Sequence, residues 1–100
     1  MNQDEARAKL DEYRVVIDEV DRRLVALLNE RTRTVEEIGR VKRSAALPIY
    51  EPKREQLVFD NITACNQGPL SPDALKRIFE RIIDEMRSIQ KQRMLSDGDK

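Results

Sequence analysis

The sequence predicts an all-α protein with one long N-terminal helix and two shorter helices per chain. From about Asp4 to Ser44 there is no proline, and apolar residues recur at intervals of three and four, the spacing of one helix face. They are Leu10, Ile17, Val20, Leu24, Leu27, Leu28, Val35, Ile38 and Val41. Two proline-containing interruptions divide the rest of the chain into two further segments of helical spacing, and no segment has the alternation of a strand.

The length of the first helix predicts a second chain. About 40 helical residues at 1.5 Å each span about 60 Å, whereas a compact domain of this size has a radius of gyration of about 13 Å. The helix must therefore project beyond its own globule, where its apolar side needs cover. A second copy of the chain is the simplest cover, so we expect an intertwined homodimeric helix bundle.

The two shorter helices begin at capping signals. Glu51-Pro52 places a proline in the first turn of a helix that we expect to run to about Asn66 and to end at Gly68-Pro69. Ser71-Pro72-Asp73 combines a capping serine, a proline and an acidic residue at the start of the third helix. The second helix carries Leu57, Val58, Ile62 and Cys65 on one side; the third carries Leu75, Ile78, Phe79, Ile82, Ile83, Met86 and Ile89.

Length and composition indicate one small domain. The 100 residues are 39% hydrophobic and 38% charged, which is an ordinary balance for a soluble protein with little core. We expect a single helical domain over residues 1–100, with residues 1–9 and 93–100 frayed. A chain of this size buries a limited share of its surface, which again favours a partner chain.

Several function classes are disfavoured by what the sequence lacks. The 19 basic and 19 acidic residues are interleaved, which offers no basic surface for nucleic acid. The start of the chain has no signal-peptide pattern and no segment is apolar enough to span a membrane, so we expect a cytoplasmic protein. With no histidine and one cysteine, a zinc site, an internal disulfide and a Cys/His or Ser/His/Asp mechanism are all disfavoured.

Two cations on the apolar side of the first helix suggest a binding site. Arg31 and Lys42 are eleven residues apart, which is three turns plus about 20°, so they leave the helix on the same side, about 16 Å apart along its axis. Long side chains that lean towards each other from this spacing leave room for a small, multiply charged anion.

Four other residues are candidates on weaker grounds. Gln90 extends the apolar side of the third helix with an amide, and a buried amide needs partners. Arg54 and Glu55 follow a proline at the start of the second helix, where side chains can point between helices. Arg14 is about 25 Å from Arg31 along the axis, so it could join the Arg31–Lys42 site only from a partner chain.

Each candidate also has a plain structural interpretation. Charged residues on a helix usually form a solvated face or an exposed ion pair. We interpret Glu30, Glu36 and Glu37, which neighbour Arg33 and Arg40 at helical spacing, as such a solvated face. Cys65 is interpreted as a small core residue and Met86 as apolar packing.

Several motifs in order resemble one enzyme family. Arg14, the run from Ile17 to Arg31 and the run from Glu37 to Lys42 resemble the first helix of the all-helical chorismate mutases. The likeness covers about Leu10 to Gln92. Its later parts are the Pro48 linker, Glu51, Arg54-Glu55, Ile78-Phe79, Ile82-Ile83 and Gln90.

This resemblance implies a dimer of three-helix chains that rearranges chorismate to prephenate in phenylalanine and tyrosine biosynthesis, with no cofactor and no metal. By resemblance, Arg31 and the partner's Arg14 grip the substrate carboxylates, and Arg54 supports them. Lys42 and Gln90 reach the ether oxygen. Glu55, together with Glu51, holds the ring hydroxyl.

Two positions depart from the family pattern, and two alternatives stay open. Met86 stands where some members carry a small polar residue, and Glu51 where some carry aspartate. The first change puts one hydrogen bond near a carboxylate in doubt, and the second lengthens a side chain. The alternatives are isochorismate pyruvate-lyase, against which Glu55 argues, and a non-catalytic helical dimerisation or regulatory module.

Overall fold

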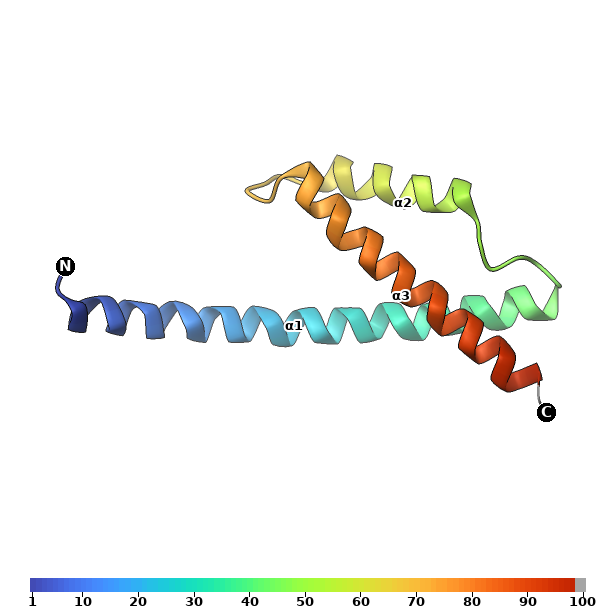
Figure 1. Ribbon diagram of the computed structural model, residues 1–100, viewed down its shortest axis with the longest axis horizontal. Helices are drawn as coiled ribbons and strands as arrows, with labels where there is room; N and C mark the ends of the chain where they lie inside the picture. Colours follow the sequence, from blue (N-terminus) through green and yellow to red (C-terminus); the bar gives the residue numbers. More distant parts are fainter. Residues whose placement is uncertain (99–100) are drawn as a thin grey trace. The chain divides into compact units, whose positions relative to one another are not determined.

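The structure is a computed structural model that describes residues 1–98, with side chains for residues 1–93. These residues form three helices and no strand: α1 (Gln3–Ser44), α2 (Pro52–Cys65) and α3 (Pro72–Gly98) (Figure 1). The all-α prediction is confirmed. The chain divides into two units, residues 1–33 and the part from Thr34 onward, and α1 continues from one into the other. The single-domain assignment stays a prediction.

Helix extends close to both ends of the described chain. The helix α1 starts at Gln3, one residue before the predicted start at Asp4. Asn2 is its cap, because the side-chain oxygen of Asn2 accepts a hydrogen bond from the backbone N–H of Glu5 at 2.8 Å. At the other end α3 passes through Ser96 and reaches Gly98. Fraying at both ends stays a prediction, and its last two positions, Asp99 and Lys100, lie outside the described residues.

The predicted starts of the two shorter helices are confirmed. Glu51 is the N-cap residue of α2, and Pro52 occupies the first helical position. The Ser71 hydroxyl accepts a hydrogen bond from the backbone N–H of Ala74 at 3.1 Å, as an N-cap does.

The loop between α2 and α3 is closed by one side chain. The Asn66 amide nitrogen donates to the carbonyl of Leu70 at 2.9 Å, and its oxygen accepts from the N–H of Gly68 at 3.0 Å. Gly68 has a φ of 72°, a left-handed conformation that glycine adopts without steric cost. The loop joins α2 to α3 as a helical hairpin (Figure 1).

The first unit is formed by the N-terminal part of α1, and its large apolar side chains are exposed. Ile17 is 57% exposed and Leu27 60%, and the other large apolar side chains from Leu10 to Leu28 are exposed as well. Such a face in water needs cover, so the intertwined homodimer stays the prediction for this unit. None of the helices in the described part of the chain is long and apolar enough to cross a membrane.

The second unit has a small core between α3 and its neighbours. The buried apolar side chains in the described part are Val35, Ile83 and Met86. The burial of Met86 is consistent with packing, and its contact with a substrate stays a prediction. The interpretation of Cys65 as a core residue is wrong, because it lies exposed at the last turn of α2 and donates to the Ile62 carbonyl at 3.5 Å. No residue of α2 is fully buried, so this helix covers the core from one side only.

We expect Ser71→Ala to lower the free energy of unfolding by about 1 kcal/mol, because the N–H of Ala74 loses its capping partner. Urea unfolding followed by circular dichroism at one fixed protein concentration measures the change. Ser88→Ala, an exposed position within α3, is the matched control and should change stability by less than about 0.5 kcal/mol. Equal effects of the two substitutions would contradict the capping role.

Candidate functional site

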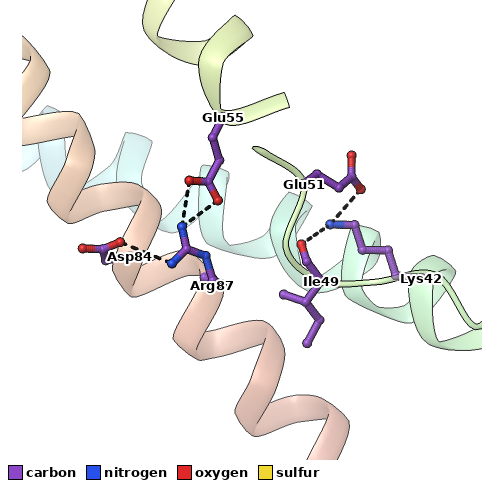
Figure 2. Close-up of polar contacts among 6 residues, drawn as sticks. All are labelled: Lys42, Ile49, Glu51, Glu55, Asp84 and Arg87. Carbon is purple, nitrogen blue, oxygen red and sulfur yellow. Dashed lines mark hydrogen bonds and ion pairs between the residues drawn. The ribbon is translucent and has the colours of Figure 1, made fainter. Parts of the chain in front are cut away.

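Lys42 is a buried cation anchored at the end of α1. The residue is 9% exposed, and its ammonium donates to the backbone carbonyl of Ile49 at 2.8 Å and pairs with the Glu51 carboxylate at 3.0 Å (Figure 2). An ammonium has three N–H donors, so these two contacts leave one more available. Its position in the last turn of α1 also places positive charge near the partly negative helix end.

The linker after α1 brings these partners to Lys42. The N–H of Leu47 donates back to the carbonyl of Lys42 at 2.7 Å, and Ala46 has a φ of 55°, which reverses the chain direction. The returning chain carries Ile49 and Glu51 past the lysine. Glu51 makes no side-chain cap for α2, so its carboxylate serves Lys42 instead.

Glu55 and Arg87 form a second charge pair, between α2 and α3. One terminal nitrogen of Arg87 donates to both carboxylate oxygens of Glu55, at 2.7 and 2.6 Å (Figure 2). The side chains are 24% and 27% exposed, respectively, so the pair is only partly screened by water. The hydrogen bond with Glu55 raises the pKa of the Arg87 guanidinium above its ordinary value, so this side chain is a cation at neutral pH.

Two further groups surround the Arg87 guanidinium. It lies 5.0 Å from the ring centre of Tyr50 and 3.6 Å from the Asp84 carboxylate. Its Nε atom is buried and donates to none of the described residues. Tyr50 lies in the linker and Asp84 one turn earlier on α3, so the arginine touches three different segments of the second unit.

Arg87 is not among the residues that the sequence predicts for the site. It lies four residues after Ile83 and three before Gln90, on the apolar side of α3. A cation on an apolar side is the signal that indicates Arg31 and Lys42 on the first helix, and the same signal applied to α3 finds Arg87.

Gln90 is buried on α3 as predicted, at 8% exposure. A Cβ atom built on Gly39 would lie 3.5 Å from the Cγ of Gln90, so the glutamine side chain packs directly on α1 there. Gly39 precedes Lys42 by three residues, which places Gln90 on the lysine's side of the helix. The Gln90 carbonyl oxygen is buried and accepts no hydrogen bond from the described residues.

The remaining predicted residues are placed differently. Arg54 is exposed on the first turn of α2. Arg14 and Arg31 belong to the first unit, where Arg14 is exposed 3.6 Å from Asp11 and Arg31 is half-buried. The second unit contains Lys42, Glu51, Glu55, Met86 and Gln90, of which Lys42 and Glu51 are in direct contact. A single site made of these five residues, and the joining of Arg14 and Arg31 to it, stay predictions.

One part of the predicted solvated face is wrong. Glu36 is only 17% exposed in its side chain and pairs with Arg93 of α3 at 2.5 Å. Its neighbour Glu37 pairs with Arg40 on the exposed side of α1, as predicted. Because α3 lies over Glu36, this carboxylate contributes to helix packing.

The grouped side chains are suited to an anion and to a hydroxyl. A buried ammonium with a remaining N–H can stabilise negative charge on an oxygen, and a fixed carboxylate can accept a hydrogen bond from a hydroxyl. The profile of the chorismate mutase type II family matches residues 13–91, which include all of these positions. The chain belongs to the chorismate mutase type II family.

Relatives and solved structures agree with the family. The chain is 31% identical over 85 residues to the chorismate mutase of Methanocaldococcus jannaschii, covering 84% of this chain and 86% of that protein. It is 36% identical over 88 residues to the bifunctional chorismate mutase/prephenate dehydratase of Aquifex aeolicus, covering 84% of this chain. It spans only 24% of that bifunctional relative's length.

The fold is likewise that of solved chorismate mutases. The enzyme of Thermus thermophilus in its form II superposes with a TM-score of 0.81 at 34% identity, over 83% of this chain and 94% of that one. The Helicobacter pylori enzyme in complex with prephenate gives a TM-score of 0.79 at 27% identity, over 85% and 92% of the two chains.

We expect Gln90→Met to leave the free energy of unfolding unchanged or to raise it by up to about 1 kcal/mol. The substitution replaces a buried carbonyl, which accepts no hydrogen bond from the described residues, with an apolar group of similar size. Urea unfolding measures the change, with the exposed Gln92→Met as the matched control. Destabilisation by more than about 1 kcal/mol relative to that control would show that the native amide is satisfied by a structural partner.

Proposed function

We propose that this chain rearranges chorismate to prephenate, a step of phenylalanine and tyrosine biosynthesis. The observation that carries the proposal is the buried Lys42, with one remaining N–H donor, on the side of α1 on which the Gln90 amide packs. Family membership gives these two residues their context.

The reaction asks for positioning and for electrostatic stabilisation. The enzyme must hold a flexible dicarboxylate in a chair-like shape and must stabilise negative charge on the ether oxygen as the C–O bond breaks. The step is pericyclic, so no nucleophile, proton transfer or cofactor takes part. A chain without histidine can therefore supply all the groups that are needed.

Lys42 and Gln90 are proposed to act on the ether oxygen. The contacts of Lys42 with Ile49 and Glu51 fix the ammonium before substrate binds, so little reorganisation is needed during the reaction. The Gln90 amide group supplies a second, neutral donor. A charged donor stabilises a developing anion more than a neutral one, so Lys42 is assigned the larger effect.

Glu55 is proposed to accept a hydrogen bond from the ring hydroxyl. A carboxylate has about four lone-pair sites, so the two bonds from Arg87 leave capacity for one from substrate. Glu51 is assigned mainly to fixing Lys42 and only secondarily to the hydroxyl. Met86 is proposed to contribute an apolar wall to the site.

The arginines are proposed to bind the substrate carboxylates, with Arg31 and the partner's Arg14 in direct contact and Arg54 in support. A guanidinium matches a carboxylate with two parallel hydrogen bonds. The exposed apolar side chains of residues 10–28 support a homodimer, and Arg14 lies among them. Arg14 can thus be donated across the dimer interface.

We expect Lys42→Met to lower kcat by about 10² to 10³, because one fixed donor to the developing oxyanion is removed. Loss of the ultraviolet absorbance of chorismate measures turnover, and circular dichroism checks the fold. Lys91→Met, exposed on α3, is the matched control and should retain parent activity.

Two results would contradict these assignments. A Lys42→Met protein within about threefold of the parent would refute the role of Lys42. A parent protein that does not consume chorismate would refute the activity itself, and release of pyruvate from isochorismate would then indicate the lyase.

We expect Arg14→Ala and Lys42→Met proteins, each inactive alone, to regain activity when unfolded and refolded together. If Arg14 serves the partner's site, a heterodimer has one doubly damaged site and one intact site. Random assortment of equal amounts makes half the dimers heterodimeric, so about a quarter of parent activity should return. The control mixture contains Arg22→Ala in place of Arg14→Ala. Arg22 is an exposed residue of α1, so the Arg22→Ala protein should be active on its own, before it is mixed with Lys42→Met.

Native mass spectrometry establishes that the mixed dimers have formed. Mixed dimers without recovered activity would show that Arg14 does not act across the interface. A folded, active monomer in sedimentation equilibrium at micromolar concentration would refute the dimer.

A further inference from the structure

We propose that Arg87 is a positioning residue for Glu55, which it holds and neutralises so that the carboxylate can accept a hydrogen bond from an anionic substrate without repelling it. The inference rests on the proposed function, because Glu55 is there assigned to the substrate hydroxyl. It adds a residue of α3 to the site.

The geometry of the pair supports positioning. A single nitrogen of Arg87 reaches both oxygens of Glu55, at 2.7 and 2.6 Å, so the carboxylate can neither rotate nor swing away without losing a bond. The guanidinium is itself held, since it lies over the Tyr50 ring at 5.0 Å and 3.6 Å from Asp84.

The environment of the pair makes its charge balance matter. Both side chains are about three-quarters covered, where charges interact more strongly than in open water. Glu55 without a cation would place a negative charge where a dicarboxylate has to bind. Lys42 plays the same part for Glu51, so both carboxylates near the start of α2 are compensated by a cation from another helix.

A residue that acts only through Glu55 must lose its effect on the substrate when the Glu55 carboxylate is removed. A double-mutant cycle measures this coupling directly. The four proteins are the parent, Arg87→Gln, Glu55→Gln and the double variant, with kcat and KM for chorismate measured for each.

We expect Arg87→Gln to lower kcat/KM by about tenfold or more, with a rise in KM, because an uncompensated carboxylate repels the substrate. In the Glu55→Gln background the same substitution should change kcat/KM by less than about threefold, since no carboxylate remains to be held. Arg87→Lys keeps the charge without the planar fork and should restore KM more than kcat.

The controls separate positioning from folding. Arg81→Gln removes an exposed arginine of the same helix, paired with Glu85 at 2.7 Å, and should leave kcat and KM at parent values. Circular dichroism and urea unfolding compare the stability of each variant. If Arg87→Gln does not fold, the cycle is built with Arg87→Lys and evaluated from kcat, because lysine keeps the charge but not the geometry that holds Glu55.

The outcomes are distinct. Non-additive losses support the proposal. Additive losses in an active parent overturn it while leaving the proposed function intact, and a loss that tracks stability alone overturns it as well. A parent without chorismate turnover overturns the proposed function and this inference together.

Discussion

The arrangement of the second unit depends on charges that are compensated between helices. Its described apolar core is small, consisting of Val35, Ile83 and Met86. Around that core, Lys42 joins the end of α1 to the start of α2 through Glu51, and Arg87 joins α2 to α3 through Glu55. A partly covered charge without its partner is costly, so these pairs exclude packings that a few apolar contacts alone would permit.

The same pairs prepare the residues for the proposed chemistry. Lys42 is held by a carbonyl and a carboxylate, which fixes its ammonium while leaving a donor. Gln90 is outside these pairs and is positioned by its packing on Gly39 of α1. In the proposed function, these groups lose most of their conformational freedom when the protein folds. Little further free energy is then needed to position them when the substrate binds.

Much of the fold could be predicted from the sequence, because its signals are local. The proline and caps at Glu51-Pro52 and Ser71-Pro72 set the starts of α2 and α3, and the proline-free apolar pattern set α1. Burial of Lys42 and Gln90 followed from their place on apolar faces. The roles proposed for them rest on the family resemblance, since spacing alone does not distinguish a ligand-binding polar residue from a structural one.

What could not be predicted depends on contacts distant in sequence. The helical spacing of Glu36 from Arg33 and Arg40 predicts a solvated face, and it does not show that Arg93 of another helix pairs with Glu36. Helical spacing places Cys65 on the apolar side of the second helix and so predicts a core residue. Spacing does not show how much of that side a neighbouring helix covers, and Cys65 is exposed. The pairing of Glu55 with Arg87, 32 residues later, needs the angle between α2 and α3 that no local pattern encodes.

The Asn66 side chain, which closes the loop between α2 and α3, has a consequence for how the unit assembles. Its two hydrogen bonds fix the short loop that reverses the chain between α2 and α3. Because this loop is short, bringing α2 and α3 into contact costs little loop-closure entropy. Contacts of α1 with α3, such as Gly39 with Gln90, close a much longer segment. Folding is therefore expected to begin with the hairpin, and the last turns of α1 dock onto a surface that has already formed.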